Sequence, residues 1–204
     1  QLMARQQNYR TFTIAFPDGH HAPAIQLDPE ADPRLVVEAF GLVSPRPTIF
    51  ITGGASLMSD EDIERTRQVV EDGIASFADE RGVTIVDGGT EAGVMQMIGI
   101  ARSKNVYKFP LIGVAPAPKV DYPGGGNTGK EADLDQSHSH FVLVNSPDWG
   151  GESSMIVNLA RTIAAGQPCM GILINGGRVA EQDVYIATAS GQDRVPVMVL
   201  EGSG

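Results

Sequence analysis

The chain has 204 residues, of which 42% are hydrophobic and 20% are charged, and its formal net charge is −10 at pH 7. These values are typical of a globular α/β domain with a sizeable core. The negative charge disfavours a nucleic-acid partner, because DNA and RNA are polyanions. No apolar run approaches the length of a membrane span, and no signal-peptide segment is visible, so we expect a cytoplasmic location.

Residues 1–46 predict an N-terminal lead-in whose strands pack on the main body. Residues 10–16 (RTFTIAF) predict a strand, and residues 34–43 (RLVVEAFGLV) predict a second strand or a short helix. Pro45 and Pro47 then interrupt the chain. The main domain is therefore expected over residues 47–204.

In the main domain, short apolar runs alternate with amphipathic segments. Strands are predicted over residues 48–52, 83–87, 111–115, 141–145, 169–174 and 195–200. The first helix is expected to begin after Ser59, which has Asp62 three residues on, and to end at Gly82. Apolar strands joined by helices predict an α/β fold, a doubly wound, mainly parallel, Rossmann-like sheet with helices on both faces.

Helical spacing also predicts which side chains face the core. These are Ile63, Val70, Ile74 and Phe77 in the first helix, Val94, Ile98 and Ala101 in the second, and Ile156, Leu159 and Ile163 in a third. Thr90 is expected to cap the second helix.

Glycines follow most of the predicted strands, in ITGGAS, VDGGTEAG, PDWGGESS, INGG and EGSG. One such pair indicates only a tight turn. Because the carboxyl ends of parallel strands gather at one edge of a sheet, several pairs predict a common ligand edge. Glycines admit a ligand close to the backbone, and helix N-termini offer free N–H groups to phosphates.

The stretch PGGGNTGKE at residues 123–131 fits most of the phosphate loop of nucleotide hydrolases. It has Glu131 where that loop needs a hydroxyl for Mg²⁺, and neither a strand directly before it nor an amphipathic helix after it. We interpret it as a mobile surface loop and a candidate lid. His138 and His140 have no further ligands nearby, so no metal is expected, and Cys169 in an apolar run is interpreted as a core residue.

The segment VDGGTEAGVMQMIG at residues 86–99 resembles the GG-x-x-x-GVM turn of the SLOG superfamily. That group joins the Lonely Guy hydrolases, the DNA-processing protein DprA and the N-terminal domains of TRPM channels. The order of ITGGASLM, VDGGTEAGVM, HFVLVNSPDWGGESSMIVNLA and PVMVLEGSG is similar to the TRPM-type branch, LSDAT, in its prokaryotic form. The resemblance covers roughly residues 47–204 and implies a sensor for a nucleotide-derived ligand, such as ADP-ribose or a cyclic relative, with no cofactor required.

Lonely Guy enzymes carry P-G-G-x-G-T-x-x-E, with a catalytic Glu. When Gly150 and Gly151 are placed on this motif, Trp149 replaces the Pro and Val157 replaces the Glu, which removes an acid/base group. Binding without catalysis is therefore the leading hypothesis. The alternative is a nucleotide phosphoribohydrolase, or another nucleotide-processing hydrolase, that uses Glu91, Asp148 or Glu152. A third hypothesis is a structural assembly domain with a vestigial pocket.

The expected ligand-binding residues combine turn amides with nearby hydroxyl, carboxyl and indole groups. They are Gly53, Gly54, Ser56, Asp87, Gly88, Gly89, Thr90, Glu91, Gly93, Asp148, Trp149, Gly150, Gly151, Ser153, Ser154, Glu201 and Gly202. Asp87 is expected either to bond a ribose hydroxyl or to fix its glycine turn, and Trp149 either to stack on a base or to pack in its loop. We also expect the chain to be part of a longer, membrane-tethered protein, and a homo-oligomer is left open.

Overall fold

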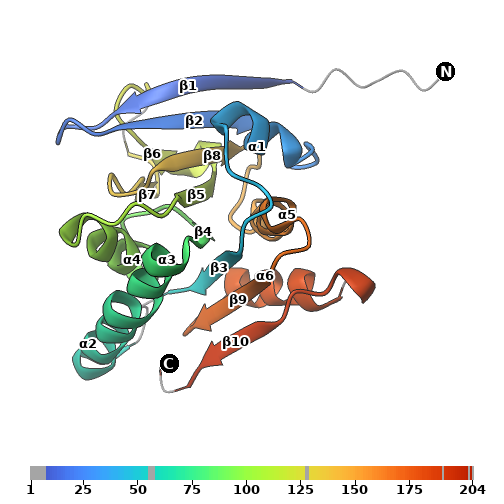
Figure 1. Ribbon diagram of the computed structural model, residues 1–204. Coiled ribbons are helices and arrows are strands. Elements are labelled where there is room, and N and C mark those ends of the chain that lie inside the picture. Colours follow the sequence, from blue (N-terminus) through green and yellow to red (C-terminus); the bar gives the residue numbers. More distant parts are fainter. Residues whose placement is uncertain (1–7, 55–57, 127–128, 190, 202, 204) are drawn as a thin grey trace.

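The computed structural model describes residues 8–54, 58–126, 129–189, 191–201 and 203. A sheet of eight strands runs through the molecule in the order β1-β2-β8-β5-β4-β3-β9-β10 (Figure 1). Its strands are β1 (Tyr9–Ala15), β2 (His21–Leu27), β3 (Thr48–Gly53), β4 (Thr84–Asp87), β5 (Leu111–Pro116), β8 (His140–Val144), β9 (Cys169–Ile174) and β10 (Val197–Leu200). A separate pair consists of β6 (Val120–Asp121) and β7 (Ala132–Asp133).

The helices are α1 (Arg34–Phe40), α2 (Asp60–Gln68), α3 (Ser76–Arg81), α4 (Gly93–Lys104), α5 (Ser153–Ala164) and α6 (Arg178–Ala189). A π-helical segment, η1 (Val69–Ala75), joins α2 to α3, and short 3₁₀ turns cover Ala117–Lys119 and Gly191–Asp193. None of the helices in the described part of the chain has both the length and the apolar character that a bilayer span requires.

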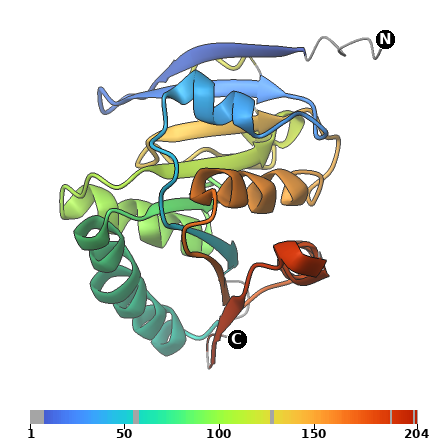
Figure 2. The ribbon, with the colours of Figure 1, turned by 45° about the vertical axis from the view of Figure 1, so that its right-hand side comes forward.

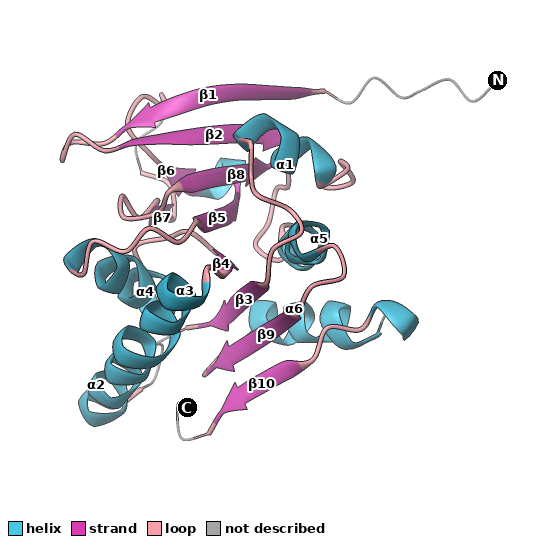
Figure 3. Cartoon of the chain, in the orientation of Figure 1, coloured by secondary structure: helices cyan, strands magenta, loops and turns pink. Residues whose placement is uncertain are grey.

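Parallel pairing dominates the central sheet. Every neighbouring pair from β2 to β10 is parallel, and β1 runs antiparallel to β2. Helices lie on both sides of the sheet, as Figures 2 and 3 show. The prediction of a mainly parallel, Rossmann-like α/β sheet is confirmed.

The two faces of the sheet carry separate cores, because successive side chains of a strand point to opposite sides. On one face, α1, α5 and α6 pack against Phe50, Val86 and Val142. On the other face, α3, α4 and η1 pack against Ile49 and Ile85. Alternate residues of β3 and β4 therefore belong to different cores, and both faces of each strand are buried.

The N-terminal residues extend the sheet with a hairpin. β1 agrees with the predicted strand, whereas β2 was not predicted, because Pro23 breaks the alternating pattern that marks a strand. β2 nevertheless lies between β1 and β8 and buries Ala22, Ile25 and Leu27. Of the two alternatives for residues 34–43, the helix is correct: α1 ends at Gly41, which has a left-handed conformation.

The helical segment after β3 begins and ends where the sequence predicts. The Ser59 hydroxyl accepts a hydrogen bond from the Asp62 backbone N–H, and Gly82 ends α3 in the left-handed conformation. Most predicted inward-facing residues are buried as well. These are Val70, Ile74, Val94, Ile98, Ala101, Ile156, Leu159 and Ile163.

Phe77 is an exception, since it is 49% exposed although it was predicted to face the core. The wider turns of η1 lie just before it and change the rotation of the helix relative to a regular α-helix. Ala78 is buried instead. A pattern that assumes 3.6 residues per turn therefore fails at this position.

A loop takes the place of a helix between β5 and β8. Val120 and Leu134 from this loop pack on the sheet against Phe141. The stretch PGGGNTGKE lies in it, and its described end is bonded to the body of the loop: the Lys130 backbone N–H donates to Asp121 Oδ2 at 3.0 Å. The described end of the stretch is therefore bonded to the rest of the loop, and its mobility stays a prediction.

Candidate functional site

The turns that leave the parallel strands lie at the carboxyl edge of the sheet. β3, β4, β8 and β9 lead there into α2, α4, α5 and α6, respectively. The strand order reverses between β3 and β9, because β4 lies on one side of β3 and β9 on the other. A parallel sheet opens a ligand crevice at such a reversal.

A cavity of about 160 Å³, which we call the inner chamber, lies at this reversal. It brings together part of the predicted site, namely Gly53, Gly88, Thr90 and Trp149, with Glu152 from the hydrolase alternative. Thr52, Met95, Ile156 and Asp183 also line it and were not predicted.

Two buried carboxyl groups face the inner chamber. Glu152 is 3% exposed and Asp183 is 2% exposed. Burial raises the pKa of Glu152 to about 7, although the Gly150 backbone N–H bonds its Oε2 at 2.8 Å. Burial also raises the pKa of Asp183, although the Thr52 hydroxyl donates a 2.5 Å hydrogen bond to it. Near pH 7, the Glu152 carboxyl group in the chamber is therefore partly protonated.

Part of this buried polar surface has no partner within the protein. The Ser153 hydroxyl approaches Asp183 and acts against burial to lower its pKa. Even so, neither Ser153 Oγ nor Asp183 Oδ1 completes a well-aligned hydrogen bond with a described residue. Buried polar atoms without a well-aligned partner are rare in folded proteins, so this pair is an exception that packing alone does not explain.

Asp183 is a functional candidate that the sequence analysis missed. It lies on the inner face of α6, between the buried residues Ala180 and Ala187. The spacing of three and four residues places all three side chains on one stripe of the helix. An acidic residue within an otherwise apolar stripe was the signal that could have identified it.

Trp149 lies between the inner chamber and the loop that follows β5. Its indole Nε1 donates a 2.6 Å hydrogen bond to Glu131 Oε2, and Lys119 forms a 2.6 Å ion pair with Glu131 Oε1. Glu131 stands where the NTPase loop would have its Mg²⁺-binding hydroxyl. In this chain, Glu131 instead holds the indole at the rim of the chamber.

Asp87, at the end of β4, belongs to a buried charge cluster. Its Oδ1 accepts 2.8 Å hydrogen bonds from the Gly89 backbone N–H and from His138 Nε2, and His138 Nδ1 lies 2.8 Å from Asp135 Oδ2. Burial alone would lower the pKa of His138, but the two carboxylates raise it to about 9. These bonds are the ones expected if Asp87 fixes the glycine turn.

The turn after β4 is also held from the side of the β5–β8 loop. Thr90 forms an antiparallel bridge with Leu134, and the Glu91 backbone N–H donates to Asp133. The prediction that Thr90 caps the next helix is wrong, because α4 begins after Ala92, which makes no side-chain cap. Thr90 lies in the bridge instead, two residues before the position that precedes the first turn of α4.

The glycines of these turns fall into two groups. A Cβ at Gly53 would lie 1.9 Å from a backbone oxygen of β9, and one at Gly89 would lie 2.7 Å from the backbone of β5, so close packing requires both glycines. A Cβ at Gly54 would meet nothing within 4 Å, and one at Gly88 would lie 3.6 Å from the nearest side-chain atom. The fold therefore does not require Gly54 and Gly88, although both leave the backbone open.

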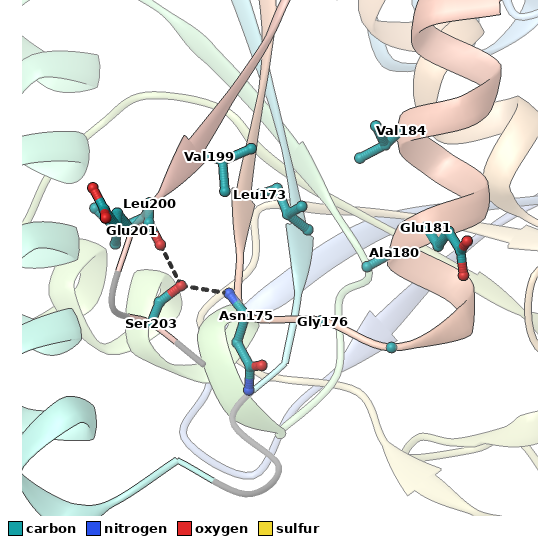
Figure 4. Close-up of a pocket in the computed structure, with 11 residues that line it drawn as sticks. Leu173, Asn175, Gly176, Ala180, Glu181, Val184, Val199, Leu200, Glu201 and Ser203 are labelled. Carbon is teal, nitrogen blue, oxygen red and sulfur yellow. Dashed lines mark hydrogen bonds between the residues drawn. The ribbon is translucent and has the colours of Figure 1, made fainter.

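A larger, open groove of about 860 Å³ lies between α6 and the strands β9 and β10 (Figure 4). Leu173, Val184 and Val199 form its apolar wall, and Glu201 lies at its rim. Ala180 lines both the groove and the inner chamber, so the two spaces are neighbours.

The remaining predicted site residues lie on the same edge but do not line the chamber. They are Gly54, Asp87, Gly89, Glu91, Gly93, Asp148, Gly150, Gly151, Ser153, Ser154 and Glu201. Glu91, Asp148 and Ser154 are exposed, whereas Ser153 is buried. Ser56 and Gly202 lie outside the described residues.

Cys169 and His138, which the sequence analysis considered as a core residue and a candidate metal ligand, both lie among residues of the fold. Cys169 is half-buried, less than a core position would be, and burial raises the pKa of its thiol to about 11. His138 is engaged in the charge cluster described above. Among the described residues, no group of His, Cys, Asp and Glu side chains is arranged to hold a metal ion.

Residues 46–204 match the protein-family model described as "SLOG in TRPM, prokaryote". The chain belongs to this family. Within the SLOG domain, Val157 is fully buried and packs in the core beneath α5. The position that the resemblance assigns to the catalytic Glu of Lonely Guy enzymes therefore faces the core and not the chamber.

Relatives of this SLOG domain include much longer channel proteins. The chain is 26% identical over 207 residues to the transient receptor potential cation channel subfamily M member 2 of Mus musculus, which covers 84% of the chain and 13% of the channel. It is 26% identical over 227 residues to a subfamily M member-like 2 channel of Nematostella vectensis, covering 90% and 14% of the two chains. The SLOG domain thus corresponds to a small part of these channels.

The charge cluster predicts how stability depends on pH. The folded pKa of His138, about 9, lies above its ordinary value of 6.5, so its contribution is fully present below pH 6.5 and is lost as the pH rises through 9. We expect His138→Gln to remove a pH-dependent loss on the order of 3 kcal/mol in the free energy of unfolding. Urea denaturation across this range measures it, with the exposed His21→Gln as a control; identical profiles for both variants would contradict the assignment.

Glu152 predicts a second, lower pH window. Its folded pKa of about 7 lies above the ordinary 4.5, so burial of the charged form makes the protein less stable as the pH rises from 4.5 through 7. Glu152→Gln keeps the size of the side chain and removes the charge. We expect the free energy of unfolding of the Glu152→Gln variant, relative to that of the unsubstituted chain, to rise by roughly 3 kcal/mol as the pH rises across this window. A constant difference in urea denaturation at all pH values would show that Glu152 titrates normally.

Proposed function

We propose that this SLOG domain is a sensor that binds a nucleotide-derived ligand, of ADP-ribose type or a cyclic relative, without chemical change. The observation that carries the proposal is the inner chamber. Strand β3, the turn after β4 and the first turns of α5 and α6 enclose it at the reversal of strand order. Ligands of open α/β sheets bind at this place.

The phosphates of such a ligand are best placed at the N-termini of α4 and α5. Neither helix has a side-chain cap bond or an acidic residue in its first turn. At α5 the N-cap residue is Glu152, whose carboxyl group accepts from the Gly150 N–H and not from the helix, so no side chain occupies the first-turn N–H groups of either helix. At α2, in contrast, Ser59 caps the helix and Asp60, Glu61 and Asp62 occupy the first turn. The open backbone at Gly88 adds room for a phosphate beside α4.

The inner chamber suits one ring of the ligand and not the whole molecule. Its volume of about 160 Å³ is below the range of roughly 300–1,000 Å³ that is usual for complete small-molecule sites. Glu152 and Asp183 offer hydrogen-bond acceptors to ribose hydroxyls, and Trp149 offers an aromatic face. The rest of the ligand then extends past Ala180 into the neighbouring groove.

The similarity to larger proteins places this binding in a wider context. The relatives are named as cation channels, and the matched region is a small part of each. We therefore propose that the domain works as the cytoplasmic, ligand-sensing part of a membrane-tethered protein. A ligand that binds only the folded state stabilises that state, and this change in stability is the response of such a domain to its ligand.

One observation favours hydrolysis as a second candidate function. Glu152 is buried in the chamber with a pKa of about 7, and enzymes raise carboxyl pKa values in this way to obtain a general acid near neutral pH. Glu91 and Asp148, the other two candidates, are exposed and do not line the chamber. If the domain is a hydrolase, Glu152 is therefore the residue that acts on the substrate.

Gly54→Ala and Gly88→Ala test the ligand edge. The fold accommodates both methyl groups, but each would stand between the backbone and a phosphate. We expect each variant to keep its thermal stability and to bind ADP-ribose about tenfold or more weakly in isothermal titration calorimetry, since charged hydrogen bonds are lost. Gly73→Ala, in η1, is the matched control, because its Cβ also meets nothing within 4 Å. Unchanged affinity in folded Gly54→Ala and Gly88→Ala proteins would show that the phosphates do not bind at this edge.

Product analysis separates the sensor from the hydrolase. We expect neither the unsubstituted domain nor Glu152→Gln to release a base or a ribose phosphate from ADP-ribose or AMP during prolonged incubation, measured by liquid chromatography. Product formation that Glu152→Gln abolishes, with ligand affinity kept, would establish the hydrolase instead.

A further inference from the structure

We propose a second ligand site, for a phosphate-bearing anion, on the hairpin side of the molecule. A cavity of about 460 Å³, which we call the hairpin cavity, lies between the β1–β2 hairpin, the loop after β5 and the turn after β8. Arg10, Gln26, Lys130 and Asn145 are among its lining residues. Arg10 and Gln26 precede residue 46, where the family match begins, so this site combines the family domain with a segment outside it.

The hairpin cavity has the opposite charge to the chain. The chain has 15 Lys and Arg residues against 25 Asp and Glu residues, yet the described lining contains Arg10 and Lys130 and no carboxylate side chain. Within the described residues, neither cation is part of an ion pair. Two cations without counter-ions on one cavity, in an acidic protein, favour an anionic ligand.

A chain of hydrogen bonds fixes the direction of the polar groups in the cavity. Arg10 Nε donates to Gln26 Oε1 at 2.9 Å, and Gln26 Nε2 donates to Asn145 Oδ1 at 2.7 Å. Asn145 Nδ2 donates in turn to Asp28 Oδ1 at 2.8 Å. Each of the two side-chain NH₂ groups donates one of its two hydrogens in these bonds, so each amide keeps one further N–H. Lys130 uses one ammonium proton on a backbone carbonyl, at 3.1 Å, and keeps two. The unused capacity of these side chains is therefore mainly that of donors.

Two stacked aromatic rings support the cations. The Arg10 guanidinium lies 5.0 Å from the ring centre of Phe12, and the Lys130 ammonium lies 6.0 Å from that of Tyr122. The two ring centres are 5.9 Å apart. Aromatic faces attract cations without neutralising them, so both charges stay available. A phosphate matches the pair, since Arg binds two oxygens as a fork and Lys acts as a point charge.

The hairpin cavity differs from the inner chamber in the chemistry that it offers. Glu152 and Asp183 in the inner chamber present acceptors, whereas the hairpin cavity presents donors. A volume of about 460 Å³ is within the range that is usual for small-molecule sites, so the ligand includes an organic group beside its phosphate. This proposal does not rest on the proposed function, because no residue lines both cavities.

Titration with inorganic pyrophosphate tests the hairpin cavity. In ¹H–¹⁵N NMR spectra, we expect pyrophosphate to shift the side-chain amide signals of Gln26 and Asn145. The double variant Arg10→Gln/Lys130→Gln is expected to weaken pyrophosphate binding about tenfold or more. Arg10→Lys, which keeps the charge but loses the fork, is expected to weaken binding less and serves if the double variant does not fold.

The matched control is Arg81→Gln/Lys108→Gln, which removes the same charge at exposed positions away from the cavity. If pyrophosphate binding weakens equally in this control, net charge alone explains the effect and the proposed site is wrong. The proposed site is also wrong if pyrophosphate does not shift the Gln26 and Asn145 signals. The Gly54→Ala variant separates the two proposals, because it leaves the hairpin cavity unchanged. Loss of the Gln26 shift in that variant would show that pyrophosphate binds at the glycine turns instead.

Discussion

The carboxyl edge depends on backbone that packs too closely for a side chain. Gly53 brings the end of β3 against β9, and Gly89 brings the turn after β4 against β5. The cluster of Asp87, His138 and Asp135 fixes the second turn by a charged bond to its backbone and by a buried salt bridge. With the end of β3 and the turn after β4 fixed, the inner chamber remains between them and α6. The shape of the site is thus a property of the backbone before any side chain is considered.

The sequence predicts the features of this architecture that arise from local patterns. The apolar strands, the Ser59 cap and the glycine turns each have a short-range signal, and parallel pairing then gathers the turns without further information. It fails where tertiary contacts override the local pattern. β2 forms despite Pro23 because β1 and β8 pair with it on both sides. Asp183 lies in an apolar stripe of α6, and packing against α5 and β3 buries it although an acidic residue ordinarily faces solvent.

The loop between β5 and β8 connects the two candidate sites. Its neighbouring residues serve both: Lys130 lines the hairpin cavity, and Glu131 holds Trp149 at the rim of the inner chamber. The turn after β8 is shared as well, since Ser146 lines the first cavity and Trp149 the second. Two residues of the stretch that resembles an NTPase loop thus have contacts at these cavities. A segment that contacts two binding sites provides a direct connection through which one ligand can influence the other.

Most of the glycine motif does not distinguish a binding domain from a structural one, because packing alone requires Gly53 and Gly89. The groups that the fold does not need are more informative. Burying Glu152 and Asp183 raises their pKa values, so the native state is destabilised by two carboxyl groups that apolar residues could replace. Local disagreement between a residue and its surroundings is typical of functional sites, where stability is lost in exchange for chemistry. The two acids face the same chamber as the open backbone at Gly88, so the destabilising groups and the accessible ones coincide at one point of the sheet. Assembly alone gives these two acids no physical role at that point, and this is the argument for the ligand binding that we propose.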